Sequence, residues 1–475
     1  MKEGVAEMSA RDLTKRVSEF VVNLSSDTLP ERIVHKSRAC LLDYFGYAWY
    51  GSVARPIRIL FQTLADSGDC TIVGRDRTTS PLIAAFINGA MGHVAELDDT
   101  HRGSMAHIGD SVIPAALAVA EAVGGDGMTL LRAVVAGYDV AARAGESLMP
   151  SHYYRGWHPS ATVNTLGAAA AAGVALGLSA QQMQHALGIA GTQICGNFAH
   201  IPERGMVKDF NPGRAAFSGL LAALLAKSGF TGATDFLENR HGLAMYGEIV
   251  RPEAFLDGLG ERFKIEEVSH KMYTACRHIH SAIDAAIEIE ATLKPRPENI
   301  DMVEIESWSH ITFCDDPTPW RDAWYGPRFS AQFNVAVALL HGKAGIDALF
   351  EPHASLRLLE DADVQSLIQK TRVVVDPAMD ESFPVLWPAR VKVRLKDGRS
   401  AIVRKDVALG EPEVPVTYGD IVGKFRRLCA LIGVPEQTQA QVLEAMARWP
   451  DIRVRELCGL LRRAPSQILA EELVL

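Results

Sequence analysis

The feature that most constrains this fold is a series of apolar segments dense in alanine and glycine. Three of them are PAALAVAEAVGG (114–125), GAAAAAGVALG (167–177) and GRAAFSGLLAALLAKSG (213–229). Their apolar residues recur at helical spacing, so each segment predicts a helix. Small side chains let helix backbones approach one another closely, which favours a compact helical body with few strands. The longest apolar run, residues 166–178, is too short to span a bilayer.

Helical periodicity extends over most of the first half of the chain. Two amphipathic helices are predicted within residues 10–51, the second one after Pro30. Further helices are predicted over residues 80–95, 111–125, 127–149, 164–178, 180–195 and 212–228. From residue 416 onward the sequence is again helical in pattern.

Beyond residue 268 the pattern changes to a mixture of strands and helices. Strands are predicted over residues 299–308, 371–377 and 389–406, the last with a hairpin turn at Asp397-Gly398. Helices are predicted between them, over residues 275–293, 330–342, 345–350 and 362–369. We therefore predict a mainly α protein with an all-helical domain (1–268), an α+β domain (269–414) and C-terminal helices (415–475) that pack back on the helical domain.

Composition and charge exclude several classes of protein. The 475 residues carry a net charge of −9 without long blocks of one sign, which argues against a nucleic-acid partner. The seven cysteines are widely spaced and form no CxxC pair, which favours a reducing compartment over a disulfide framework. The first residues lack the apolar segment of a signal peptide. We therefore expect a cytoplasmic protein with no membrane partner.

A polar segment, AELDDTHRGSMAHIGDS (95–111), lies between two of the apolar helical segments. Its titratable residues are Glu96, Asp98, Asp99, His101, Arg102, His107 and Asp110. Asp110 or Ser111 is a predicted N-cap, so His107 would lie just before the N-terminus of a helix. Such a density of titratable groups in a short connection between core helices indicates a functional site.

Two further polar residues stand at the start of small-residue helices. His158 precedes the alanine-rich segment, and Lys208 precedes a helix for which Asn211 is the predicted cap and Pro212 the first residue. The unpaired N–H groups and positive potential of a helix N-terminus suit a carboxylate or phosphate. The same potential disfavours a protonated imidazole, so His107 and His158 could act as neutral bases.

The segment that opens the predicted α+β domain carries a fourth group of polar residues. On a helix, Arg277, His280 and Asp284 would share one face, because they lie at positions i, i+3 and i+7. Lys271 and Tyr273 lead into that helix. We expect this segment to close an anion-binding pocket at the domain boundary, a common place for ligand sites.

Six segments, taken together and in order, resemble the MmgE/PrpD family, which includes 2-methylcitrate dehydratase, cis-aconitate decarboxylase and iminodisuccinate epimerase. They are residues 29–52, 88–121, 156–179, 207–232, 271–285 and 328–343. The resemblance implies a cofactor-independent enzyme, a homodimer, and a site between a large helical domain and a smaller α+β domain.

The resemblance also assigns site residues. The family's D-x-D-D-T element matches Glu96, Asp98, Asp99 and Thr100, so its first acidic residue is glutamate here. The family's site histidines and lysines match His107, His158, Lys208 and Lys271. Decarboxylase-like members carry a site tyrosine near an S-x-Q-Y pattern, and this chain has Phe333 in that pattern, which weakens a decarboxylase interpretation.

The reactions of the family share a carbanion next to a carboxylate. His107 and His158 would serve as base and acid in either order, while Asp98 and Asp99 orient a histidine or act directly. Lys208 is the remaining candidate for catalysis. The predicted substrate-binding residues are Glu96, Thr100, Lys271, Tyr273, Arg277 and His280. His93, Asp98, Asp99, His101 and His107 could suggest a metal, but their spacing fits no compact metal-ligand motif, so we expect no metal. The family resemblance implies that the reaction needs no cofactor.

Our first hypothesis is a dehydratase of a small hydroxylated di- or tricarboxylate. An epimerase or isomerase would return the proton to the other face of the same carbon, and a decarboxylase is the third hypothesis. A different class is a catalytically silent protein that binds carboxylates without exchanging substrate protons.

Overall fold

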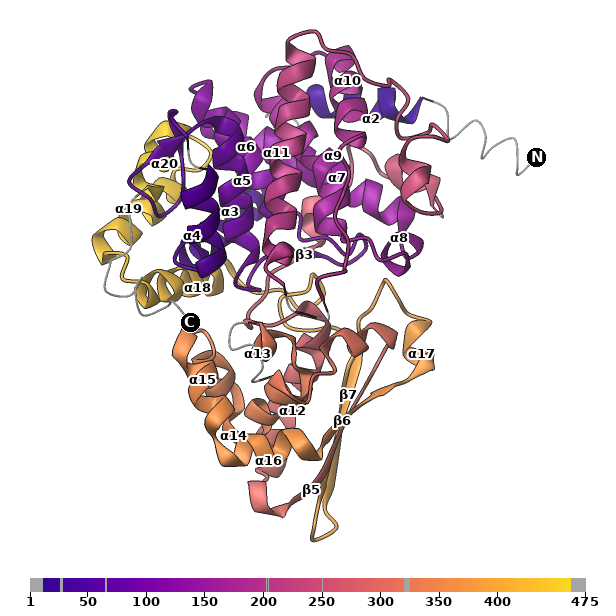
Figure 1. Cartoon of the computed structure of the whole chain (residues 1–475), viewed down its shortest axis with the longest axis vertical. Helices are drawn as coiled ribbons and strands as arrows, with labels where there is room; N and C mark the ends of the chain where they lie inside the picture. Colours follow the sequence, from indigo (N-terminus) through magenta and orange to yellow (C-terminus); the bar gives the residue numbers. More distant parts are fainter. Residues whose placement is uncertain are drawn as a thin grey trace, which may run out of the picture. The chain divides into compact units, whose positions relative to one another are not determined.

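The computed structural model describes residues 12–25, 29–64, 66–201, 203, 205–249, 251–319 and 325–462. It confirms a mainly α protein with a smaller α+β part (Figure 1). One compact unit contains the chain up to His200, Gly205–Val268 and the segment from Thr417 onward, and the second contains Ile201–Arg204 and Ser269–Val416. In the part of the chain described, no helix is long and apolar enough to cross a membrane.

The first unit is built mainly from helices. They are α2 (Leu13–Val22), α3 (Glu31–Gly51), α4 (Arg55–Leu64), α5 (Pro81–His93), α6 (Gly109–Ala122), α7 (Gly127–Leu148), α8 (Ser151–Tyr154), α9 (Pro159–Ala175), α10 (Ala180–Gly191), α11 (Val207–Lys227), α18 (Tyr418–Leu431), α19 (Glu436–Ala447) and α20 (Val454–Leu461). Helix α9 contacts α6, α7, α10 and α11, and every residue of α9 is buried (Figure 1). The alanine-rich helix is therefore the centre of this unit.

Small residues permit this packing. A Cβ atom added at Gly219 of α11 would lie 2.5 Å from the backbone nitrogen of Ala169 in α9. A Cβ atom at Gly137 of α7 would lie 2.9 Å from Ala171 of α9. Both distances are shorter than a van der Waals contact, so the helix backbones touch where glycine leaves room.

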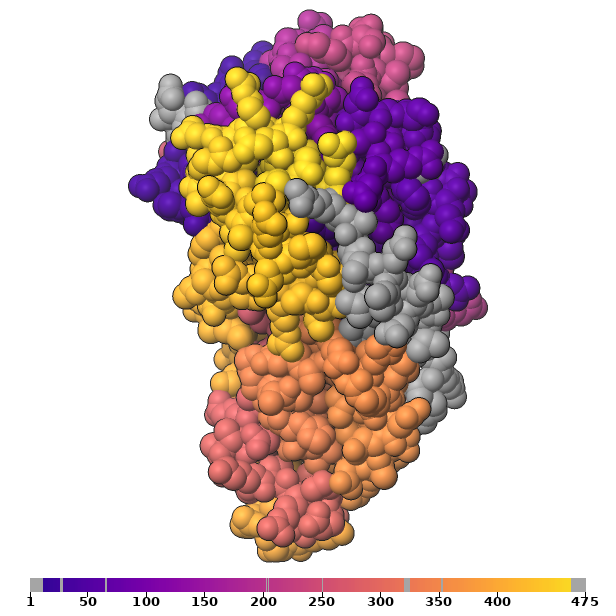
Figure 2. Space-filling model, turned by 90° about the vertical axis from the view of Figure 1, so that its left-hand side faces the viewer, coloured from indigo at the N-terminus to yellow at the C-terminus, as the bar shows by residue number. Residues whose placement is uncertain are grey.

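The C-terminal helices belong to the same unit as the N-terminal ones (Figure 2). Lys424 of α18 forms a buried ion pair with Asp43 of α3, with 2.7 Å between Nζ and Oδ1, and it also donates to the carbonyl oxygen of Leu97. Near the end of the chain, the Trp449 indole donates to Ser37 Oγ at 3.2 Å. The segment from Thr417 onward thus packs on α3.

The predicted N-cap residues of two helices are wrong. Helix α6 begins at Gly109 after Ile108, without a side-chain cap, and Asp110 lies inside its first turn. Helix α11 begins at Val207, so Asn211 is an interior residue and not the cap. The reason is local: the Lys208 N–H group donates to the carbonyl oxygen of Gly205, which starts the turn earlier. His158 immediately precedes α9, which begins at Pro159 and so earlier than the predicted range of 164–178.

The second unit contains a four-stranded sheet in the order β6-β5-β7-β8. The strands are β5 (Ile300–Ser307), β6 (Thr371–Val375), β7 (Ala389–Leu395) and β8 (Ser400–Lys405). Strand β5 pairs parallel with β6, with Ile305 opposite Val373, and antiparallel with β7. Strands β7 and β8 form the predicted hairpin, in which Gly398 adopts a φ of 88° that glycine accommodates without strain.

Helices α12 (His280–Leu293), α14 (Ala331–Ala348) and α16 (Ala362–Lys370) pack on this sheet. The remaining helices of the unit are α13 (Gly326–Phe329), α15 (Pro352–Glu360) and α17 (Pro377–Asp380). Helix α14 joins the two helices predicted over 330–342 and 345–350, with a kink at Gly342, whose φ is 58°. Phe333 is buried in the core of this unit.

We predict that Gly219→Ala destabilises the protein by about 1–3 kcal/mol, because the added methyl group overpacks the contact between α11 and α9. The matched control is Gly423→Ala in α18, where a Cβ atom would meet nothing within 4 Å. That control should be neutral or stabilising by up to about 1 kcal/mol, because alanine favours a helix over glycine. Urea denaturation measures both, and equal stability of the two variants would contradict the close packing of α9 and α11.

Candidate active site

His107 lies in the loop between β3 (Thr100–His101) and α6. Its Nδ1 atom is 2.9 Å from the backbone carbonyl oxygen of Asp99 and 3.0 Å from Asp98 Oδ2. The Thr100 hydroxyl lies 3.2 Å from the same nitrogen. A carbonyl oxygen only accepts hydrogen bonds, so Nδ1 carries the proton and the lone pair of the neutral ring is on Nε2.

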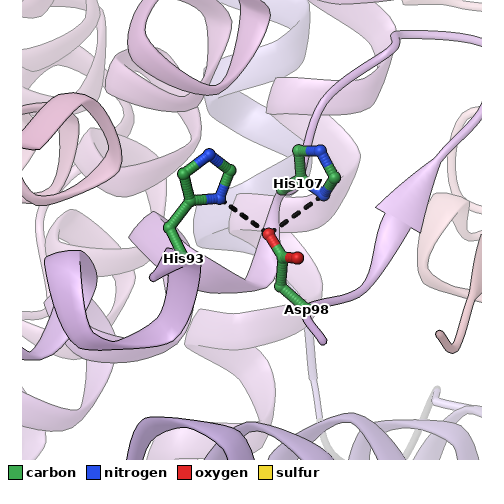
Figure 3. A group of neighbouring side chains, drawn as sticks. All are labelled: His93, Asp98 and His107. Atoms are coloured by element: carbon green, nitrogen blue, oxygen red, sulfur yellow. Dashed lines mark hydrogen bonds and ion pairs between the residues drawn. The ribbon is translucent and has the colours of Figure 1, made fainter. Parts of the chain in front are cut away.

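Asp98 connects His107 to a second histidine. Asp98 Oδ2 forms a hydrogen bond with Nδ1 of His93, the last residue of α5, at 2.7 Å, and the same oxygen makes the ion-pair contact with His107 (Figure 3). Asp110 Oδ2 lies 2.9 Å from the same His93 nitrogen. His93 is fully buried, and the sequence pattern had suggested it only as a possible metal ligand.

Lys208 completes this group from the first turn of α11. Its Nζ atom lies 2.6 Å from His93 Nε2 and forms an ion pair with the Glu96 carboxylate. The side chains of Lys208 and His107 are 13% and 14% exposed, whereas the Asp98 side chain has no exposed surface. The side chains of Lys208 and His107 therefore retain some exposed surface, whereas that of Asp98 retains none.

His158 adds a third imidazole. Its Nδ1 atom lies 3.0 Å from Asn211 Nδ2, which donates a hydrogen bond, so the proton of the neutral ring is on Nε2. The His158 ring centroid lies 5.5 Å from that of His93 and 6.0 Å from that of His200. The sequence pattern did not single out His200, because it does not lie at the start of a predicted helix and belongs to no motif.

Burial keeps these histidines neutral. It lowers the pKa of His93 to about 3, with a further decrease from the Lys208 ammonium. Burial also lowers the pKa of His158 well below its usual range and that of His200 to about 4. At neutral pH the rings therefore act as hydrogen-bond donors or proton acceptors, and Lys208 supplies the positive charge.

Asp99 points its carboxylate away from the histidines. Its Oδ1 atom accepts from the Gly109 backbone at 3.0 Å, and its Oδ2 atom accepts from the Tyr138 hydroxyl. Burial raises the pKa of Asp99 to about 6. The contact of Asp99 with His107 is made by its backbone carbonyl group, so its side chain supports the loop that carries His107.

The predicted site residues after position 268 belong to the second unit. The Tyr273 hydroxyl donates to Asp284 Oδ1 at 2.5 Å, and Arg277 pairs with Glu411 at 2.7 Å. Arg277 also donates to His280 Nδ1 at 2.8 Å. The prediction that Arg277, His280 and Asp284 share one helix is wrong for Arg277. Arg277 lies in a 3₁₀ turn (Arg277–Ile279), and α12 begins at His280.

Lys271 of the same unit is fully buried. The structure thus places Lys271 in the interior, and it gives Tyr273, Arg277 and His280 hydrogen-bond partners within their own unit.

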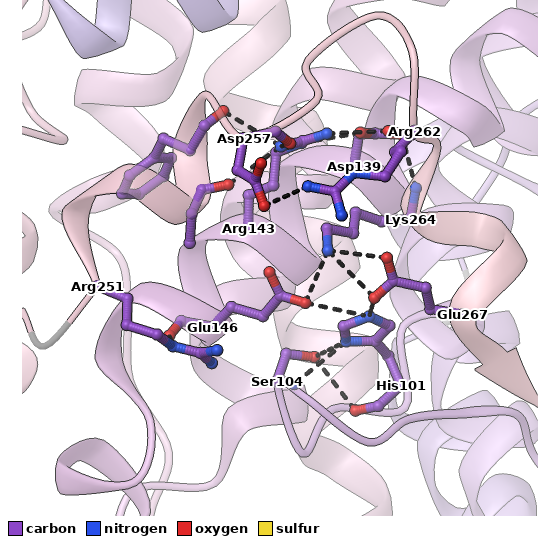
Figure 4. Close-up of polar contacts among 12 residues, drawn as sticks. His101, Ser104, Asp139, Arg143, Glu146, Arg251, Asp257, Arg262, Lys264 and Glu267 are labelled. Carbon is purple, nitrogen blue, oxygen red and sulfur yellow. Dashed lines mark hydrogen bonds and ion pairs between the residues drawn. The ribbon is translucent and has the colours of Figure 1, made fainter. Parts of the chain in front are cut away.

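Among the described residues, two groups in the first unit bring metal-ligand atoms within 4.8 Å of one another. The first consists of His93, Asp98 and His107. His93 Nδ1 donates to the Asp98 carboxylate and His107 Nδ1 donates to the Asp99 carbonyl oxygen, so both nitrogens carry protons, which suits a proton network better than a cation. The second consists of His101, Glu146 and Glu267. There the Lys264 ammonium lies 2.9 Å from each of the two glutamates, so an internal cation already balances them (Figure 4).

Comparison with known proteins matches both parts of the chain to one family. Residues 15–247 match the model of the MmgE/PrpD N-terminal domain, and residues 273–449 match that of the MmgE/PrpD C-terminal domain. The chain is 27% identical to a cis-aconitate decarboxylase-like protein of Aspergillus oryzae, over 95% of this chain and 97% of that protein. It is 26% identical to cis-aconitate decarboxylases of Aspergillus terreus (97% and 98% of the two chains) and Mus musculus (88% and 87%).

The lowered histidine pKa values predict that the free energy of unfolding decreases as the pH is lowered. The unfolded chain binds a proton at each histidine near pH 6.5, whereas the pKa of folded His93 is about 3 and that of buried His152 about 4. Between these values the unfolded state binds more protons, so the free energy of unfolding should decrease from pH 6.5 toward pH 4. The slope should approach about 1.4 kcal/mol per pH unit for each such histidine.

Urea denaturation at a series of pH values measures this slope. The variant His152→Gln should reduce the slope by up to about 1.4 kcal/mol per pH unit, because it removes one such histidine. His35→Gln removes a histidine whose side chain is 64% exposed and serves as the control. A slope that is unchanged in His152→Gln would contradict the neutral state of the buried ring.

Proposed function

The chain belongs to the MmgE/PrpD family, and we propose that it is a cofactor-independent lyase that acts on a small di- or tricarboxylate. The first step would remove a proton from the carbon next to a carboxylate. The observation that carries this proposal is the arrangement of His107, whose Nδ1 is held by Asp98 and the Asp99 carbonyl group. The Nε2 atom of this partly exposed side chain then bears the lone pair of a base.

His107 is the base in this proposal. When Nε2 takes the substrate proton, the ring becomes an imidazolium, and the Asp98 carboxylate at 3.0 Å stabilises that charge. The Asp99 carbonyl oxygen fixes the tautomer, because it accepts a hydrogen bond from Nδ1 at 2.9 Å. The sequence had left the choice of base between His107 and His158 open, and the hydrogen bonds of the two rings support His107.

Lys208 and His158 would stabilise the negative charge that develops on the substrate. An ammonium group next to a substrate carboxylate favours the transition state when that carboxylate gains electron density. His158 presents Nε2–H as a neutral donor, because Asn211 donates to its other nitrogen. In a dehydration, the departing hydroxyl group must take up a proton, and Lys208 is the cationic donor that we propose for it.

The leading candidate reaction is the dehydration of a hydroxylated di- or tricarboxylate. A second candidate is the decarboxylation of a cis-aconitate-like acid, because the similar proteins of Aspergillus and Mus musculus are cis-aconitate decarboxylases or resemble one. In that reaction CO₂ leaves, and the carbanion takes up a proton. Phe333 stands where decarboxylase-like members carry a tyrosine, so we place decarboxylation second. An epimerase would use the same base without expelling water.

Proton NMR of the purified protein in D₂O tests these alternatives. The panel contains citrate, 2-methylcitrate, cis-aconitate and iminodisuccinate, each with EDTA present. Formation of an alkene, or addition of water across one, establishes a dehydratase, while loss of CO₂ establishes a decarboxylase. Deuterium incorporation without net loss of substrate identifies an epimerase. Binding of an acid without any exchange of its protons would contradict the enzyme and support a silent carboxylate-binding protein.

We predict that His107→Gln lowers kcat by about 10²–10⁴-fold, the usual contribution of a general base. The change keeps a polar side chain of similar reach but cannot take up a proton, so substrate binding should be largely retained. Steady-state kinetics and calorimetric binding separate the two effects. His152→Gln, which replaces a buried histidine bonded to Thr162 and Tyr246, is the control and should keep its kcat. Retention of full turnover in His107→Gln would exclude His107 as the base.

A further inference from the structure

His93 makes contacts of opposite polarity through its two ring nitrogens. On one side, Nδ1 lies 2.7 Å from a carboxylate oxygen of Asp98 and 2.9 Å from one of Asp110. On the other side, Nε2 lies 2.6 Å from the Lys208 ammonium. The ring is fully buried at the end of α5. The imidazole thus stands between two carboxylates and a cation, with no exposed surface of its own.

These contacts determine where the proton of His93 lies. The carboxylate oxygens accept, so Nδ1 carries the hydrogen. The ammonium group has donors only, so Nε2 must offer its lone pair. A second proton on the ring would be directed at the Lys208 ammonium, 2.6 Å away, and would replace an attraction by a repulsion. His93 is therefore held neutral in a single tautomer.

We propose that His93 is a positioning residue that orients the Lys208 ammonium for the substrate carboxylate. This role rests on the function proposed above, in which Lys208 binds that carboxylate. The rigid imidazole fixes one donor direction of the ammonium group, and the Glu96 carboxylate fixes another. These two contacts together fix the directions of all three N–H bonds of Lys208, because the ammonium group is tetrahedral.

His93 also links Lys208 to the proposed base. Asp98 Oδ2 accepts from His93 Nδ1 at 2.7 Å and lies 3.0 Å from His107 Nδ1. The ammonium group, His93 and Asp98 are thus joined by hydrogen bonds, and an ion-pair contact joins Asp98 to His107. A displacement of His93 would disturb both the group that binds the carboxylate and the carboxylate that orients the base.

A buried histidine in the same unit provides a structural comparison. His152 is also fully buried, but its ring nitrogens contact the Tyr246 carbonyl oxygen at 2.8 Å and the Thr162 hydroxyl at 2.7 Å. These partners are uncharged. Changes at His152 therefore report the general cost of replacing a buried imidazole, without the ammonium and carboxylates that surround His93.

The experiment compares His93→Gln and His93→Leu with His152→Gln and His152→Leu in the full chain. Glutamine can donate to a carboxylate and accept from Lys208, whereas leucine can do neither. We expect His93→Leu to raise KM roughly 10- to 100-fold, the range seen when a group that orients a ligand-binding residue is removed. His93→Gln should recover most of this loss, and the His152 variants should lower the unfolding midpoint without raising KM.

Calorimetric titration with tricarballylate, a tricarboxylate without a hydroxyl group, tests the same role independently of turnover. The dissociation constant should weaken in His93→Leu and recover in His93→Gln. This measurement separates the two proposals: if no acid of the panel reacts but the binding pattern holds, the proposed function fails and the role of His93 stands. Equal binding by the glutamine and leucine variants, or equal weakening in His152→Leu, would overturn the role of His93.

A spectroscopic measurement on the unaltered protein covers the case in which the leucine variant does not fold. In ¹⁵N-histidine-labelled protein, the His93 signals, identified by their loss in His93→Gln, should show a protonated Nδ1 and an unprotonated Nε2 from pH 8 to pH 5. The opposite tautomer, or protonation of the ring within this range, would overturn the proposal.

Discussion

The close approach of α5, α6 and α11 is the constraint on which the site depends. A Cβ atom at Gly89 of α5 would lie 2.9 Å from the Asp110 carbonyl oxygen in α6 and 2.9 Å from Gly213 of α11. Glycine is needed at this contact because any side chain would separate the helices. Since Lys208 lies in the first turn of α11 and His93 in the last turn of α5, this packing brings the ammonium group to the imidazole.

Burial gives that arrangement its chemical properties. Carboxylates and an ammonium group removed from water are stable only when they are paired and hydrogen-bonded, and the chain from Lys208 through His93 to Asp98 satisfies both requirements. The same burial keeps His93 and His158 neutral, so positive charge is restricted to Lys208. Of the residues in this site, Lys208 and His107 keep partly exposed side chains.

Much of this arrangement could be predicted from the sequence, and the reasons for the failures are physical. Helical spacing predicted α9 and α11, and the polar segment predicted His107, because periodicity and composition are local properties. The start of α11 was wrong because Asn211 and Pro212 resemble a helix start, while hydrogen bonds from the preceding turn decide the boundary. His93 was missed as a partner of Lys208 because that contact joins residues 115 positions apart.

Glu96 shows how the contact with Lys208 determines local backbone structure. Its φ is 53°, a left-handed conformation that costs a residue with a side chain about 1–2 kcal/mol. Aspartate tolerates this conformation better than glutamate does, so the choice of glutamate here needs a stabilising contact. Such strain persists only where surrounding interactions determine the geometry, and the ion pair with Lys208 is an interaction of this kind. The left-handed turn at Glu96 and the position of the Lys208 ammonium group therefore depend on each other.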